Sequence, residues 1–221
     1  MMSSRTDTIG PGRVAGLPEH EVDAVEDESG TTLTLDELRL RPWRHADAPA
    51  VLAACQDPEI ARWVALADPF GPQDADAFVD DAMRMWREGT GTPFAVVDAA
   101  TDRVLGAVTR FGPDGHLATF GCWVAPGARG RGIGRRSLGL LADWTFATTS
   151  TVRIDGYIMV GNETSERMLL GLGWQREGVL RAWHLRADGT PVDCVVYSLL
   201  RTDEGPAGPV GRAHEGTRHR P

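Results

Sequence analysis

The run Arg129-Gly130-Arg131-Gly132-Ile133-Gly134 combines the residue types in this sequence that are best suited to holding an anion. It follows an expected strand that ends at Ala125, and it comes before an amphipathic helix. The first N–H groups of a helix lack intrahelical partners and carry partial positive charge, and glycine lets a ligand approach the backbone closely. The loop is therefore predicted to bind a phosphate or diphosphate, with the arginines adding positive charge.

Two other phosphate-binding loops fit this spacing poorly. A Walker A loop requires GxxxxGK[ST], but Ile133 stands where its lysine would follow Gly132. A dinucleotide fingerprint requires GxGxxG after the first strand of a parallel unit, whereas this loop reads GxGxG after several strands expected to be antiparallel. A flexible turn with incidental arginines stays open as the simplest alternative.

The hydrophobic periodicity predicts an α/β (α+β) domain with a mostly antiparallel sheet. Asp57-Pro58 and Gly71-Pro72 are interpreted as breaks between elements. Apolar residues alternate in the expected strands and recur at helical spacing in the expected helices. The expected order is strand 38–43, helix 47–55, helix 74–87, strands 94–97, 104–111 and 117–124, a helix after the glycine loop, strand 152–160, helix 163–171, and strands 174–185 and 192–200.

One folded domain is expected over residues 35–201. Residues 1–34 are acidic and almost without aromatic side chains, so we expect a flexible acidic N-terminal tail. Residues 202–221 are rich in glycine and proline and are expected to form a flexible C-terminal tail. The folded part is long enough to bury one sizeable core.

Composition excludes some classes of function. The net charge of -8 argues against a protein that binds nucleic acid through a broad basic face. The 3 cysteines lack the spacing of a metal site or a disulfide framework, and no apolar run is long enough to span a bilayer. A soluble cytoplasmic protein without a bound metal is expected, with no nucleic-acid or membrane partner.

Several motifs in order resemble the GNAT superfamily of acetyl-CoA-dependent N-acetyltransferases, in particular its RimJ/RimL-like branch of ribosomal-protein N-terminal acetyltransferases. Arg129, Gly132 and Gly134 match the cofactor loop [Q/R]xxGx[G/A]. The branch pattern Asn-xx-Ser, Gly-Phe, Glu-Gly, Arg resembles Asn162 to Ser165, Gly173-Trp174, Glu177-Gly178 and Arg181, and the likeness spans about residues 35–201.

This resemblance implies a GNAT fold with a six- to seven-stranded sheet, helices on both faces and a splayed central strand pair. Acetyl-CoA would be the co-substrate, with its pantetheine arm beside Trp123 and Val124 and its diphosphate at residues 129–134. The resemblance also implies cofactor contacts from Asn162 and Arg167. For Asn162, capping of the helix that follows it is an equally good interpretation.

Acetyl transfer to an amine needs a base for the amine and a proton for the departing thiolate. The resemblance suggests the Ser165 hydroxyl as the acid, because Leu169 stands where many GNAT enzymes have a tyrosine. His184 is our candidate base, since histidine is the side chain that changes charge nearest neutral pH. Glu177 and Asp193 are rival bases, and core roles are favoured for Tyr157 and Tyr197.

The acceptor suggested by the branch is a protein or peptide N-terminus. A small amine, such as an amino acid, a polyamine or an antibiotic, is a second possibility. A third is a non-catalytic acyl-CoA-binding module. Trp63, Trp86 and Trp183 could line an acceptor pocket or fill the core. The protein is expected to be a monomer or a homodimer.

Overall fold

The computed structural model describes residues 5–9, 22–27, 30–64, 66–186 and 188–203. Its strands are β1 (Arg5–Ile9), β2 (Val22–Asp27), β3 (Gly30–Leu35), β4 (Leu38–Pro42), β5 (Gly91–Asp98), β6 (Val104–Phe111), β7 (Leu117–Val124), β8 (Arg153–Met159), β9 (Gln175–Leu185) and β10 (Pro191–Leu200). Its helices are η1 (His45–Asp47), α1 (Ala48–Cys55), α2 (Pro58–Trp63), α3 (Pro72–Glu88), η2 (Pro126–Ala128), α4 (Ile133–Thr148) and α5 (Glu163–Gly171).

The described strands form one sheet in the order β1-β2-β3-β4-β5-β6-β7-β8-β10-β9. All neighbours pair antiparallel except β7 and β8, which run parallel. Strands β4 to β10 correspond to the seven strands expected from the sequence. The predicted α+β class with a mostly antiparallel sheet is confirmed.

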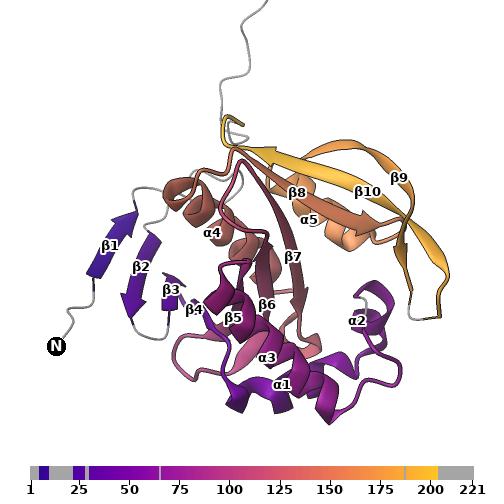
Figure 1. Ribbon diagram of the computed structural model, residues 1–221, viewed down its shortest axis with the longest axis horizontal. Helices are drawn as coiled ribbons and strands as arrows, with labels where there is room; N and C mark the ends of the chain where they lie inside the picture. The colour runs from indigo at the N-terminus through magenta and orange to yellow at the C-terminus, as the bar shows by residue number, and fades with distance from the viewer. Residues whose placement is uncertain (1–4, 10–21, 28–29, 65, 187, 204–221) are drawn as a thin grey trace, which may run out of the picture.

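Helices cover both faces of the sheet (Figure 1). Successive side chains of a strand point to opposite faces. On β5, Phe94 belongs to the core cluster that includes α4 and α5, whereas Ala95 belongs to the cluster that includes α1, α2 and α3. The amphipathic helices thus bury apolar stripes against opposite faces of the sheet.

The strands β7 and β8 separate along their length, as Figure 1 shows. They pair only from Leu117 opposite Arg153 to Thr119 opposite Asp155. Beyond Thr119, β7 continues to Val124 and is paired only with β6. The predicted splayed central pair is therefore present, and its gap widens toward the glycine-rich loop that follows β7.

The N-terminal residues differ from the flexible tail expected over 1–34. Strands β2 and β3 extend the sheet beyond β4, and Ala24 and Leu33 are buried in the core. Leu33 and Leu35 alternate with threonines and share one face with the core, a period-two signal that the acidic composition obscured. The expected C-terminal tail lies almost wholly outside the described residues.

The helix α2 is a second difference from the predicted order. The sequence Asp57-Pro58 by itself predicts only a break between elements. In the structure, the Asp57 carboxylate accepts hydrogen bonds from the N–H groups of Glu59 and Ile60, and Pro58 occupies the first turn. Both are common at the start of a helix.

Among the described residues, no helix is long and apolar enough to cross a membrane.

Candidate active site

The glycine-rich loop has the backbone geometry expected for an anion site. Gly130 and Gly132 have φ values of 75° and 71°, in the left-handed region that favours glycine. Gly132 is the N-cap of α4, so the first N–H groups of that helix face the loop. A Cβ at either glycine would meet no protein atom within 4 Å, so these positions border open space.

Gly134 serves a different purpose from the other two glycines. A Cβ there would lie 3.2 Å from the Met168 sulfur and 3.2 Å from a Val124 methyl carbon. The glycine therefore lets α4 approach β7 and α5 closely. Ile133 is buried in the core and anchors the same turn. The loop is held in place by packing on its helical side.

The loop arginines do not all contribute free positive charge. The Arg129 guanidinium lies 2.8 Å from the Asp57 carboxylate, and Arg136 lies 2.6 Å from that of Glu37. The hydrogen bond from Arg136 lowers the pKa of Glu37 to about 2. The exposed Arg131 has no such close carboxylate partner among the described residues. The charge of Arg129 and Arg136 is therefore offset by a neighbouring carboxylate, a detail that the loop pattern did not predict.

Trp123 and Val124 form the end of β7, on the edge that borders the gap. The Trp123 indole packs 6.3 Å from the Trp43 ring and 6.5 Å from the Phe78 ring, on the face covered by α1 and α3. The Val124 carbonyl accepts a hydrogen bond of 3.3 Å from Nε of Arg129. Beyond Thr119 no strand pairs with this edge of β7, so its backbone borders the gap, but the carbonyl of Val124 is already occupied by Arg129.

The residues predicted on α5 are held by their own helix. The Asn162 side chain accepts a hydrogen bond of 3.2 Å from the N–H of Ser165. Asn162 is thus the N-cap of α5, as its alternative interpretation expected. Arg167 is exposed and donates to the carbonyl of Glu163. The structure does not bring Arg167 to the glycine loop through any hydrogen bond among the described residues.

His184 lies on β9 opposite Val192, close to the β9–β10 turn. Its Nε2 is buried and has no hydrogen-bond partner among the described residues. A buried polar atom without a partner costs about 1–3 kcal/mol, so such atoms call for an explanation and are found at functional sites. No hydrogen bond joins His184 to Ser165 in the described part of the chain.

An aromatic pair next to His184 was missed from the sequence. Trp183 is 54% exposed and stacks on Tyr157, with ring centroids 5.2 Å apart. Tyr157 itself is only half-buried, whereas Tyr197 is buried and donates to Glu166. Tyr157 lies on β8 past the last residue that pairs with β7, so the pair flanks the gap. Burial and the neighbouring Asp155 raise the pKa of Tyr157.

The rival carboxylate bases have structural partners. Glu177 accepts hydrogen bonds from Ser198 and Arg153, which lower its pKa and make it a weaker base. Asp193 accepts from the N–H of Ala182, whose φ of 51° marks a bulge in β9. Both carboxylates therefore have structural partners, whereas Nε2 of His184 has none among the described residues.

Trp86, Trp63 and Cys122 lie in different surroundings. Trp86 is half-buried, packs edge-on against the core residue Phe94 and donates to the carbonyl of Pro93. Trp63 lies on α2 beside the Arg62 guanidinium. Burial raises the pKa of Cys122 to about 12, which makes a nucleophilic thiolate unfavourable.

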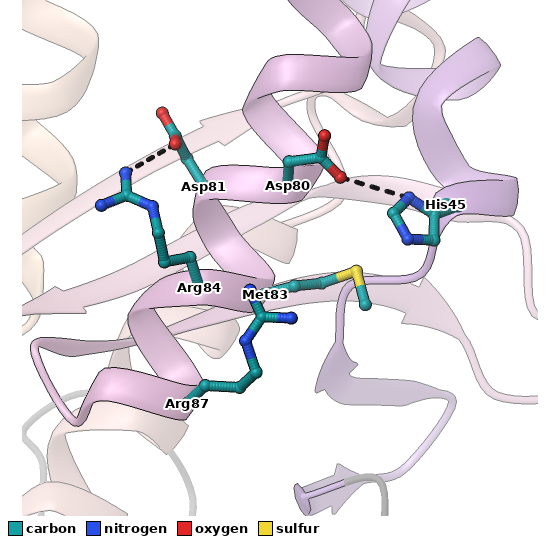
Figure 2. A pocket seen from close by; sticks show the side chains of 6 residues that line it. All are labelled: His45, Asp80, Asp81, Met83, Arg84 and Arg87. Atoms are coloured by element: carbon teal, nitrogen blue, oxygen red, sulfur yellow. Dashed lines mark hydrogen bonds and ion pairs between the residues drawn. The ribbon is translucent and has the colours of Figure 1, made fainter.

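A shallow surface pocket between η1 and α3 contains none of the predicted site residues (Figure 2). Nδ1 of His45 lies 3.3 Å from Asp80, and Arg84 lies 2.6 Å from Asp81, all on exposed side chains. Exposed pairs of this kind contribute little and are common on helix surfaces. The pocket is lined by His45, Asp80, Asp81, Met83, Arg84 and Arg87.

Comparison with known proteins agrees with this geometry. The model of the acetyltransferase (GNAT) domain family matches residues 37–175. The chain belongs to the GNAT acetyltransferase family. As a GNAT N-acetyltransferase it uses acetyl-CoA as its acetyl donor, and the predicted enzyme class is confirmed.

Similar proteins span most of this GNAT enzyme. It is 26% identical to the uncharacterized N-acetyltransferase YoaA of Bacillus subtilis over 174 residues, covering 78% of this chain and 98% of that one. The ribosomal-protein-S5-alanine acetyltransferase of Vibrio fischeri has a similar fold, with a TM-score of 0.67 at 21% identity over 79% of this chain and 99% of that one. The microcin C7 self-immunity acetyltransferase MccE, solved with acetyl-CoA and AMP, also has a similar fold. Its TM-score is 0.68 at 20% sequence identity, and the match covers 79% of this chain and 98% of that one.

Proposed function

We propose that this GNAT enzyme acetylates the N-terminal amine of a protein or peptide, and that acetyl-CoA binds between the glycine loop and the β7–β8 gap. The observation that carries the proposal is the continuous path from Gly130 and Gly132, with their left-handed backbone, along the free edge of β7 to the point where β8 diverges. The loop offers N–H groups to a diphosphate, and the strand edge offers backbone groups to the pantetheine amides.

The proposed residues act in two places. Residues Arg129 to Gly134 surround the diphosphate, and Trp123 and Val124 border the pantetheine arm. Asn162 and Arg167 keep their proposed cofactor contacts at the start of α5. Asn162 also has the capping role already described.

The proposed chemistry is direct attack in a ternary complex. The amine nitrogen attacks the thioester carbonyl carbon, and the carbon–sulfur bond then breaks. His184 accepts the proton that the amine loses, and Ser165 donates a proton to the departing thiolate. Binding both substrates side by side supplies a large share of the acceleration, because it replaces a bimolecular encounter.

A peptide acceptor is supported by the exposed aromatic pair of Trp183 and Tyr157. Trp183 is exposed and rigidly stacked on Tyr157, so it offers an apolar surface to residues that follow the acceptor amine. The fold is also similar to that of a ribosomal-protein-S5-alanine acetyltransferase. A small-molecule amine is the second candidate, because MccE has a similar fold and confers self-immunity to microcin C7.

The test is release of free CoA thiol from acetyl-CoA in the presence of two acceptor panels. One panel contains short peptides with free N-termini and the same peptides with blocked N-termini, and the other contains amino acids, polyamines and aminoglycosides. We expect thiol release and a mass gain of one acetyl group with free peptides only. Release with small amines alone would overturn the peptide proposal and favour the second candidate.

A further inference from the structure

Arg129 joins the glycine loop to two other parts of the molecule. Its Nη2 donates to the Asp57 carboxylate at 2.8 Å, across 72 residues of sequence. Its Nε donates to the Val124 carbonyl at the end of β7, at 3.3 Å. The guanidinium therefore lies on the strand edge that the pantetheine arm is proposed to follow. Its hydrogen bonds are to Val124 and Asp57, which lie outside the loop.

Asp57 is well suited to hold this arginine. Its carboxylate also accepts from the N–H groups of Glu59 and Ile60 at 3.0 and 3.1 Å, so its rotamer is fixed by the start of α2. The hydrogen bond from Arg129 is the main cause of the lowered pKa of Asp57. The carboxylate is therefore ionised at neutral pH and competes with any other anion for the same guanidinium.

The helix α2 places this carboxylate at the wide end of the gap. Figure 1 shows α2 between the lower end of β7 and the β9–β10 turn. At its other end, the Trp63 ring would lie 3.8 Å from a Cβ at Gly161, just after β8. The carbonyl of Arg62 accepts from Arg186, which follows β9. The helix α2 thus contacts the loop after β7 at its Asp57 end and the segments after β8 and β9 at its other end.

We propose that Asp57 is a positioning residue that holds Arg129 on the end of β7 and thereby limits the affinity of the loop for the diphosphate of acetyl-CoA. Arginine binds phosphate groups strongly through charge-assisted hydrogen bonds, so releasing it from Asp57 adds a donor to the diphosphate. The inference rests on the proposed placement of the diphosphate at residues 129–134. The consequence is faster release of CoA, a step that limits the turnover of many enzymes.

The test is a double-mutant cycle measured by calorimetric titration with acetyl-CoA. Asp57→Asn removes the charge but keeps a good N-cap, so α2 is expected to remain folded. Asp57→Ser also removes the charge, and serine is likewise a good N-cap residue. We expect either variant to bind acetyl-CoA about two- to fivefold more tightly, the range that partly exposed ion pairs support. The dissociation rate of CoA and the KM for acetyl-CoA should fall by similar factors.

The second arm of the cycle places the same change in an Arg129→Gln background. If Asp57 acts by holding Arg129, Asp57→Asn will change the affinity of Arg129→Gln by less than about 1.5-fold. Asp81→Asn removes an exposed carboxylate from α3 and controls for net charge, and it should leave the affinity unchanged. Melting curves of each variant without ligand verify that α2 has not unfolded.

Two outcomes would overturn the inference. Unchanged or weaker binding by both Asp57 variants would show that the pair does not limit affinity. A tightening that persists in the Arg129→Gln background would show a general field effect of the carboxylate. The proposed function fails separately, if the wild-type protein does not bind acetyl-CoA or if folded Gly132 variants bind it normally.

Discussion

At the scale of single residues, the environments of Ser165 and His184 differ in a way that suits their proposed roles. Ser165 occupies the first turn of α5, and its N–H is bonded to Asn162, which fixes the backbone from which its hydroxyl projects. The Nε2 of His184 is buried and has no partner among the described residues. A hydroxyl on a fixed turn can donate a proton, and an unpartnered ring nitrogen can accept one.

We expect Ser165→Ala and His184→Ala each to lower kcat by about 10²- to 10⁴-fold, because a positioned proton-transfer group typically contributes that much. The Kd for acetyl-CoA should change little. Steady-state kinetics with an accepted peptide and calorimetric binding separate the two effects. Near-normal kcat in either variant would make that residue structural. For His184 the role would then pass to Asp193, Glu177 or a relayed water.

Substitution of Trp183 tests where the acceptor peptide binds. Truncation of this exposed ring to alanine should raise the KM for a peptide acceptor about tenfold, because a stacked aromatic contact and its buried area are lost. The KM for acetyl-CoA should be unchanged. Trp86→Phe in the core is the matched tryptophan substitution, and it should lower stability without a selective effect on acceptor KM. An unaltered acceptor KM in Trp183→Ala would place the acceptor elsewhere.

At the scale of elements, the junction of β7 and α4 explains why glycine occurs where it does. Gly130 and Gly132 satisfy a backbone requirement and leave space, whereas Gly134 allows close packing against Met168. A glycine pattern in a loop can therefore mix conformational, ligand-related and packing reasons. The loop motif alone did not separate these reasons.

Gly132→Ala is expected to weaken acetyl-CoA binding at least about tenfold, while the protein remains folded. The φ of 71° is unfavourable for alanine by about 1–2 kcal/mol, and the new methyl would border the proposed diphosphate. Gly127→Ala is the control, since its φ is not positive and a Cβ there meets nothing within 4 Å. Equal affinity of the two variants, measured by titration calorimetry, would tell against the loop as the diphosphate site.

At the scale of the whole molecule, the sheet extends through β3 into residues that were expected to form a tail. Leu33 is fully buried and lies opposite Leu40 of β4. Removing its side chain should cost about 2–5 kcal/mol of unfolding free energy, because a cavity is left in the core. Denaturant unfolding of Leu33→Ala checks this, with the half-buried Thr34→Ala as a control expected to cost less than about 1 kcal/mol. If Leu33→Ala and Thr34→Ala both lowered the unfolding free energy by the same small amount, the segment that contains β3 would be a dispensable tail.

Acid stability provides a second test at this scale. The buried Arg41 guanidinium contacts Asp47 and Asp102, and its hydrogen bond is the main cause of the lowered pKa of Asp102. A carboxyl whose pKa is lower in the folded state stabilises the protein above its unfolded pKa of about 4, and that contribution is lost as pH falls below this value. Asp102→Asn should therefore lower the melting temperature at pH 7, and the difference from wild type should shrink below about pH 4. A difference that is constant with pH would contradict this.

The sequence by itself determined the seven strands β4 to β10, the helices α1, α3, α4 and α5, and the glycine loop, but not α2. Period-two and helical patterns are local, and the left-handed positions of Gly130 and Gly132 follow from short-range sterics. For the same reason β6, β7 and α5 begin and end where the pattern predicted. The splayed strand pair and the acetyl donor came from the resemblance of several ordered motifs to one family. The location in the cell and the oligomeric state stay predictions.

Only the tertiary structure decided which side chains meet. Asp57 and Arg129 are 72 residues apart, and nothing in the local pattern pairs them. Tyr157 lies in an apolar strand, so the sequence predicts a core residue, but in the structure the exposed Trp183 of β9 stacks on its ring. Burial and charge partners depend on the packing of distant segments, whereas periodicity records only which face of one element is apolar.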